Sequence, residues 1–87
     1  MIKENHSLIG KITKPHGIDG TVNIQLNGSF AEKIETEEPL FVMIDGTLVP
    51  FFMEEIRPVG NSALVKLEFV DSEKEARKLS SMEVYFP

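Results

Sequence analysis

The two histidines and the paired carboxylates of the chain are the residue types most able to do chemistry. His6 and His16 lie ten positions apart, and the sequence contains no cysteine that could complete a metal site with either. Glu54 and Glu55 fall in a segment where polar and apolar residues alternate, so as neighbours on a strand they are expected to point to opposite faces. Paired acid and base catalysis needs both carboxylates on one face. We therefore predict no catalytic residues, no metal and no cofactor.

The most unusual polar segment covers residues 11–20, with the sequence KITKPHGIDG. It carries Lys11, Lys14 and His16, whose side chains can donate hydrogen bonds to phosphate or carboxylate groups. These three residues are the candidate partner-binding residues. On a chain of net charge −5, they form a local exception to the acidic balance.

The same segment also has a purely architectural interpretation. Pro15 and two glycines three positions apart predict a tight connection between two strands. In that interpretation Gly17 and Gly20 adopt positive φ or allow a close backbone approach, and Ile18 plugs one end of a barrel. Gly17, Ile18 and Gly20 are accordingly predicted to be structural turn residues, and the residues alone leave both interpretations open.

Composition limits the class of protein. The chain has 87 residues, and 9 Lys and Arg against 14 Asp and Glu give 9 − 14 = −5. This length supports one domain. The acidic balance argues against non-specific nucleic-acid binding, which needs several phosphates neutralised. The absence of cysteine fits a reducing compartment, so we expect a cytoplasmic protein. No apolar run approaches the roughly 20 residues that span a membrane.

Alternating polar and apolar residues dominate the chain and predict strands. Strands are expected over residues 7–14, 21–26, 40–44, 47–56 and 83–86, with one more that begins at Asn61. Asp45 and Gly46 predict a tight hairpin, and residues 57–61 are expected to form a loop because Pro58 cannot donate to a strand ladder. We predict an all-β fold, a six-stranded antiparallel closed β-barrel, since closure removes exposed strand edges.

The apolar face of each strand predicts the interior of the barrel. In the strand that begins at Asn61, the side chains of Ala63, Val65, Leu67 and Phe69 are expected to share one face. The interior is predicted to include Ile12, Val22, Ile24, Leu26, Val42, Ile44, Val65, Leu67 and Val84.

The period changes after Val70, where a short helix is expected near residues 72–79. Ser72 and Glu75 have the spacing of a capping box, in which each side chain accepts from the backbone N–H of the other residue. Only Ala76 and Leu79 are apolar, so the helix is expected to lie as a lid on one end of the barrel. A second helical turn, capped by Ser29, is expected over residues 30–34.

Residues 9–22 (IGKITKPHGIDGTV) resemble the opening signature of the ribosome maturation factor RimM family. In that family a glycine–lysine strand leads into a histidine–glycine–isoleucine turn and a second strand that starts at a glycine. The later segments agree in order, and the resemblance covers essentially all 87 residues. These segments are Phe30, then residues 39–42 (PLFV), 63–67 (ALVKL), 75–79 (EARKL) and 83–86 (EVYF).

The resemblance implies a barrel of the translation-factor type over residues 1–87, followed in the longer protein by a PRC-type barrel domain that this chain lacks. It implies a ribosome assembly factor domain that assists maturation of the small (30S) subunit and processing of 16S rRNA by binding the subunit head. The implied partners are the precursor of the small subunit, ribosomal protein S-nineteen of the head, and rRNA. We expect the chain to be a monomer. From the residues alone, a generic protein-binding β-barrel unrelated to ribosomes is the alternative. The sequence beyond Pro87 would separate the two.

Overall fold

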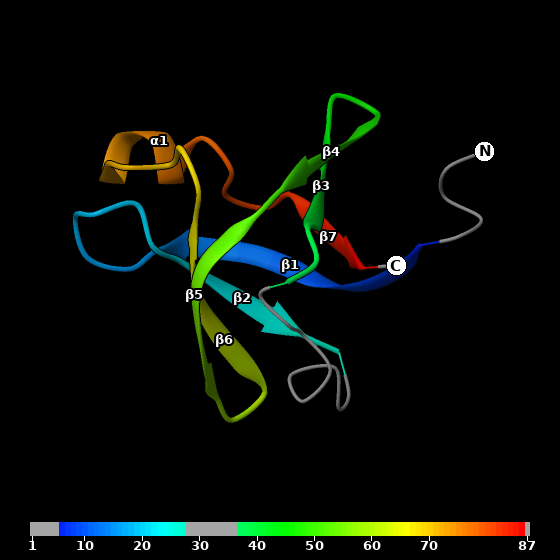
Figure 1. The fold of residues 1–87 in the computed structure, drawn as a ribbon, viewed down its shortest axis with the longest axis horizontal. Helices are drawn as coiled ribbons and strands as arrows, with labels where there is room; N and C mark the ends of the chain where they lie inside the picture. The colour runs from blue at the N-terminus through cyan, green and yellow to red at the C-terminus, as the bar shows by residue number, and fades with distance from the viewer. Residues whose placement is uncertain (1–5, 28–36, 87) are drawn as a thin grey trace.

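The computed structural model describes residues 6–27 and 37–86. These residues form one antiparallel sheet that curls into a half-barrel, with a short helix at one end (Figure 1). The all-β fold class predicted from the sequence is confirmed. The helical turn predicted over residues 30–34 lies outside the described residues.

Seven strands and one helix make up the fold. In chain order they are β1 (Ser7–Pro15), β2 (Val22–Leu26), β3 (Leu40–Ile44), β4 (Thr47–Phe51), β5 (Met53–Val59), β6 (Ser62–Leu67), α1 (Glu73–Arg77) and β7 (Glu83–Phe86). Their order across the sheet is β4-β3-β7-β1-β2-β6-β5. The last strand of the chain therefore lies in the middle of the sheet, between β3 and β1.

The strand count differs from the predicted six because the segment expected over residues 47–56 is interrupted at Phe52. The part before Phe52, β4, pairs with β3, and the part after it, β5, pairs with β6. The backbone N–H of Glu68 donates to the carbonyl of Phe52 at 2.9 Å. One bent segment of chain thus supplies both outer strands of the described sheet, and this bend curls the sheet.

The loop predicted over residues 57–61 is wrong in extent. Strand β5 continues to Val59, and Pro58 lies in register with Ala63 of β6. Proline is accepted here because β5 is an outer strand, whose free edge does not require an N–H donor. The turn is left to Gly60 and Asn61, and Gly60 has φ of 60°.

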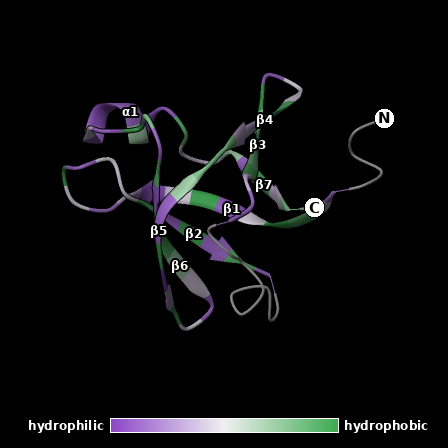
Figure 2. Ribbon diagram, in the orientation of Figure 1, coloured by the Kyte–Doolittle hydropathy of each residue, from purple (hydrophilic) through white to green (hydrophobic). Residues whose placement is uncertain are grey.

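The core lies on the concave side of the curled sheet. Eight of the nine predicted interior residues are buried, and the exception, Ile44, is half-buried and packs against the core. Figure 2 shows the underlying alternation of hydrophobic and hydrophilic residues along β1 and β2. Phe69 does not join Ala63, Val65 and Leu67, because the chain turns after Leu67. A φ of 69° leaves Phe69 85% exposed.

The helix is capped at Ser72 as predicted, with one difference. The Ser72 Oγ accepts from the Glu75 N–H at 3.1 Å, but Glu75 Oε1 accepts from the N–H of Asp71, at 2.8 Å, rather than from Ser72. Ala76 and Leu79 are buried in the core, so the helix covers one end of the half-barrel.

Candidate functional site

The loop between β1 and β2 is the segment that the sequence singles out, and the structure shows how it is built. The backbone N–H of His16 donates to the carbonyl of Thr21 at 2.8 Å, which closes the loop at its base. Gly17 and Gly20 have φ of 78° and 99°, so the positive φ predicted for both glycines is confirmed. Residues with a Cβ resist this conformation.

Asp19 stabilises the tip of the loop through its side chain. Its Oδ1 accepts from the backbone N–H of Thr21 at 3.0 Å, the arrangement of an Asx turn. This hydrogen bond holds the pKa of the Asp19 carboxyl below its ordinary value of 3.8. The loop therefore carries a negative charge at neutral pH beside His16.

Gly20 places the loop against the segment that leads into α1. A Cβ on Gly20 would lie 1.9 Å from the carbonyl oxygen of Val70 and 3.0 Å from the Cα of Asp71. Both atoms belong to the backbone and cannot rotate away. Only a glycine at this position allows the two segments to meet so closely.

The prediction that Ile18 plugs a barrel end is wrong. Its side chain is 82% exposed at the tip of the loop. The end of the half-barrel is instead filled by Val70, Ala76 and Leu79, which are all buried in the core cluster. These residues come from α1 and the segments that flank it.

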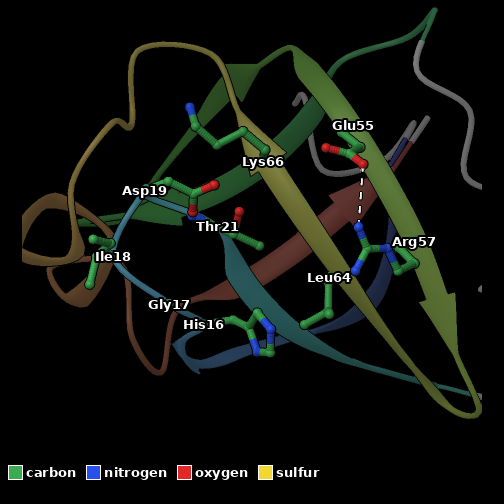
Figure 3. A pocket seen from close by; sticks show the side chains of 9 residues that line it. All are labelled: His16, Gly17, Ile18, Asp19, Thr21, Glu55, Arg57, Leu64 and Lys66. Carbon is green, nitrogen blue, oxygen red and sulfur yellow. Dashed lines mark hydrogen bonds and ion pairs between the residues drawn. The ribbon is translucent and has the colours of Figure 1, made fainter.

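An open groove of 370 Å³ lies between this loop and the strands β5 and β6 (Figure 3). The loop contributes His16 and Thr21, with Gly17, Ile18 and Asp19 at its tip. The strands contribute Glu55, Arg57, Leu64 and Lys66. Because β6 pairs with β2, its side chains come to lie beside the loop that precedes β2.

The charged groups on the strand side of the groove already have ion-pair partners. Lys66 Nζ lies 2.9 Å from Asp71 Oδ1 and 3.8 Å from Glu54 Oε1, and its side chain is 13% exposed. Arg57 lies 3.5 Å from Glu55, and both of these side chains are well exposed. Lys66 therefore ties β5 and β6 to the segment before α1, whereas Arg57 remains accessible to a ligand.

Of the three predicted partner-binding residues, only His16 lines this groove. Lys11 and Lys14 are exposed on β1. Lys11 is in register with Gln25 on one side and Glu83 on the other, and Lys14 is in register with Asn23, after a bulge in β1. The structure therefore distributes the three donors along β1 and its loop rather than gathering them in one pocket.

Sequence reasoning missed Arg57 and Lys66 as neighbours of the loop. They lie about forty residues or more from His16 in the chain, and only the pairing of β6 with β2 and of β5 with β6 brings them there. The alternation of Ala63, Val65 and Leu67 does indicate that Lys66 faces outward. It does not indicate which strand lies next to β6.

Within residues 6–27 and 37–86, no three histidine, cysteine or acidic side chains gather as ligands for a metal ion. The one helix in the same ranges is too short to cross a membrane.

Comparison with known proteins decides the family. The model of the RimM N-terminal domain matches residues 7–87. The chain belongs to the RimM family. Among RimM relatives, the ribosome maturation factor RimM of Phocaeicola vulgatus is 42% identical over 89 residues, which cover 100% of this chain and 51% of the relative. That of Bacteroides thetaiotaomicron is 41% identical over 86 residues, covering 98% of this chain and 48% of the relative.

Solved RimM structures share the fold. The crystal structure of RimM from Pseudomonas aeruginosa superposes with a TM-score of 0.80 at 24% identity, over 95% of this chain and 51% of that one. The solution structure of the N-terminal domain of RimM from Thermus thermophilus gives 0.73 at 19% identity, over 95% and 89% of the two chains. The chain spans about half the length of the curated RimM relatives that it matches.

Proposed function

We propose that this chain is a ribosome assembly factor domain that assists maturation of the small (30S) ribosomal subunit and processing of 16S rRNA. The observation that carries the proposal is the match over the whole chain to relatives named ribosome maturation factor RimM. In this proposal the domain acts in the cytoplasm, by binding and without catalysis. Its companion in the longer protein is a PRC-type barrel domain.

The surface proposed to contact the subunit head is the exposed face of β1 and the loop that follows it. Lys11, Lys14 and His16 are all exposed there. Within the described part of the chain, the ion pairs involve other cations, namely Arg57, Lys66 and Arg77. Lys11 and Lys14 are thus available to phosphate groups of rRNA or to carboxylates of ribosomal protein S-nineteen.

Contacts of this kind are individually weak. An exposed ion pair contributes about 0.2–1 kcal/mol, so three such donors cannot hold a large particle alone. Linking the domain to a second binding domain raises the effective concentration of the loop at its target. We therefore propose that this domain, a monomer, binds the precursor of the small subunit measurably only in the longer protein.

The test is genetic and uses the longer protein. Cells that lack it should accumulate precursors of the small subunit that contain unprocessed 16S rRNA, and the wild-type protein should restore processing. A Lys14→Ala, His16→Ala protein should restore it poorly. A matched Lys74→Ala, Lys78→Ala protein, which removes two exposed cations at α1, should restore it fully. Normal 16S rRNA processing in the deleted cells would refute the function.

A further inference from the structure

The groove between the β1–β2 loop and the strands β5 and β6 has the size of a site for a small molecule or a single nucleotide. Its volume of 370 Å³ falls at the lower end of the roughly 300–1,000 Å³ that ligand pockets occupy. The ionic contacts proposed above for Lys11 and Lys14 make no use of it, since neither side chain lines the groove. The groove therefore calls for a ligand of its own.

A row of residues in register runs across four strands and through the groove. Lys14 of β1 lies opposite Asn23 of β2, and Asn23 lies opposite Leu64 of β6. Leu64 in turn lies opposite Arg57 of β5. The neighbours of Asn23 and Leu64 along their strands are buried core residues, so these two side chains point to the outer face of the sheet. Leu64 thus gives the groove an apolar surface, with a cation at each end of the row.

The two sides of the groove offer hydrogen-bonding groups of opposite kinds. Arg57 on the strand side carries a guanidinium, which only donates. It stays accessible, because its ion pair with Glu55 is 3.5 Å long and exposed. Asp19 on the loop side carries a carboxylate, which only accepts when it is ionised. Figure 3 shows Asp19 and Arg57 on these two sides of the groove, with His16 and Leu64 below them.

Asp19 has acceptor sites left after it has stabilised the loop. Its Oδ1 accepts the N–H of Thr21 at 3.0 Å, whereas the two oxygens of a carboxylate together offer about four acceptor sites. The same hydrogen bond orients the carboxylate and lowers its pKa, so Asp19 is ionised at neutral pH. An oriented, ionised carboxylate is suited to accept two parallel N–H bonds from one planar group.

Guanine is the nucleobase whose edges match this arrangement. Its N1–H and N2–H groups are adjacent donors that fit a carboxylate, and its O6 and N7 atoms accept from an arginine. Adenine and cytosine each place a ring acceptor beside their amino group, and uracil places acceptors on both sides of its single N–H. In those three bases an acceptor would face the charge of Asp19. The flat face of a base can also stack on the imidazole of His16.

We propose that this groove binds one unpaired guanine of a single-stranded RNA segment, with Asp19 accepting from N1–H and N2–H and Arg57 donating to O6 and N7. The charges of Asp19 and Glu55 disfavour a phosphate inside the groove. The phosphates that flank the guanine therefore lie outside it, toward Lys14. That the RNA is 16S rRNA rests on the proposed function. A free guanine nucleotide carries the same base, and the experiment distinguishes the two sources.

The experiment titrates the chain, labelled with nitrogen-15, with the RNA pentamers UUGUU, UUAUU, UUCUU and UUUUU, and separately with GMP and GTP. Amide chemical shifts report the affinity and the residues affected, including for weak binding. Asp19→Asn tests the carboxylate, because asparagine keeps the acceptor for Thr21 and replaces the second oxygen with a donor. Asp45→Asn is the matched control, since Asp45 is exposed at the β3–β4 turn with φ of 51°, which asparagine also adopts. Urea unfolding checks that each variant is folded.

UUGUU should bind the wild-type chain about tenfold more tightly than the other three pentamers, and should shift the amides of residues 16–21 and 64–66. Asp19→Asn should lose this preference, and Asp45→Asn should keep it. Arg57→Gln should weaken the preference, whereas Arg77→Gln, at an exposed arginine of α1, should leave it unchanged.

The direction of the Asp19→Asn effect separates a guanine site from a general attraction for phosphates. Removal of a negative charge strengthens non-specific binding, so without a guanine site all four pentamers should bind Asp19→Asn more tightly than they bind the wild type. That result would overturn the inference, as would equal affinity of the wild type for all four pentamers. Tighter binding of GMP or GTP than of UUGUU would overturn RNA as the source of the guanine.

The longer protein separates this inference from the proposed function. If its Asp19→Asn variant binds small-subunit precursors as the wild type does, and the chain shows no preference for UUGUU, the guanine site falls and the proposed function stands. If cells that lack the longer protein process 16S rRNA normally while the chain prefers UUGUU, the guanine site stands and the proposed function falls.

Discussion

Two glycines in the β1–β2 loop provide a direct test of how this loop is built. Gly17 and Gly20 both have positive φ, but their surroundings differ. A Cβ on Gly17 would meet nothing within 4 Å, whereas a Cβ on Gly20 would lie 1.9 Å from the Val70 carbonyl oxygen and 2.6 Å from the Val70 carbonyl carbon. Alanine at the two positions therefore separates backbone strain from steric conflict.

The expected magnitudes follow from these two terms. Gly17→Ala should lower the free energy of unfolding by roughly 1–2 kcal/mol, the cost of placing a residue with a Cβ in the left-handed region. Gly20→Ala carries the same strain and must also separate the loop from the backbone of residues 70–71. Overpacking of this kind adds roughly 1–3 kcal/mol, so Gly20→Ala should cost about 3 kcal/mol or more.

Urea unfolding followed by circular dichroism measures both variants. For a domain of this size the free energy falls by about 1 kcal/mol per molar urea, so the midpoint should drop by about 1–2 M for Gly17→Ala and by about 3 M or more for Gly20→Ala. Amide chemical shifts of Val70 and Asp71 should change in Gly20→Ala and stay unchanged in Gly17→Ala. Equal losses for the two variants would refute the close approach of the loop to Val70.

Three further predictions concern the core, the helix cap and the loop carboxylate. Val65→Ala should cost about 1–3 kcal/mol, because Val65 is fully buried, while Val59→Ala at an exposed position should cost less than about 0.5 kcal/mol. Ser72→Ala should cost about 1 kcal/mol and reduce the protection of amides 73–77 from hydrogen exchange; unchanged protection would contradict the cap. The pKa of Asp19 is lowered on folding, so its charge stabilises the fold above pH 3.8 and this contribution is lost as the pH falls below that value. Asp19→Asn keeps the acceptor for Thr21 without the charge. The urea midpoint should therefore be higher for the wild type than for the variant at pH 6 and equal for the two proteins near pH 2. A difference that stays constant with pH would contradict a stabilising charge on Asp19.

The sequence predicts those features of the fold that depend on neighbouring residues. Alternation places Val22, Ile24 and Val65 in the core, and the spacing of Ser72 and Glu75 predicts the helix cap. The break at Phe52 follows from a bend that lets one segment pair with β3 and then with β6. No local pattern records those two pairings. The positive φ of Phe69 is likewise hidden, because phenylalanine is not a residue that favours such a turn.

The candidate site shows the same division. The glycines and His16 lie on one loop, so their spacing alone predicts a tight connection with positive φ. Arg57 and Lys66 reach the loop only through the register of β5 and β6, which depends on long-range pairing. The architectural interpretation of the loop predicts that Ile18 plugs a barrel end, but this side chain is exposed. The residues that cover that end of the half-barrel come instead from around α1, more than fifty positions later in the chain.

Binding of the longer protein to purified precursors of the small subunit, measured by co-sedimentation over a series of salt concentrations, tests the central claim most directly. The wild-type protein should bind the precursors, and a Lys14→Ala, His16→Ala variant should bind them more weakly with a shallower dependence on salt, since fewer counterions are released. The variant should retain the urea midpoint of the wild type, because both side chains are exposed. Equal affinity and an equal salt slope in a folded variant would contradict the claim that this loop contacts the ribosomal precursor.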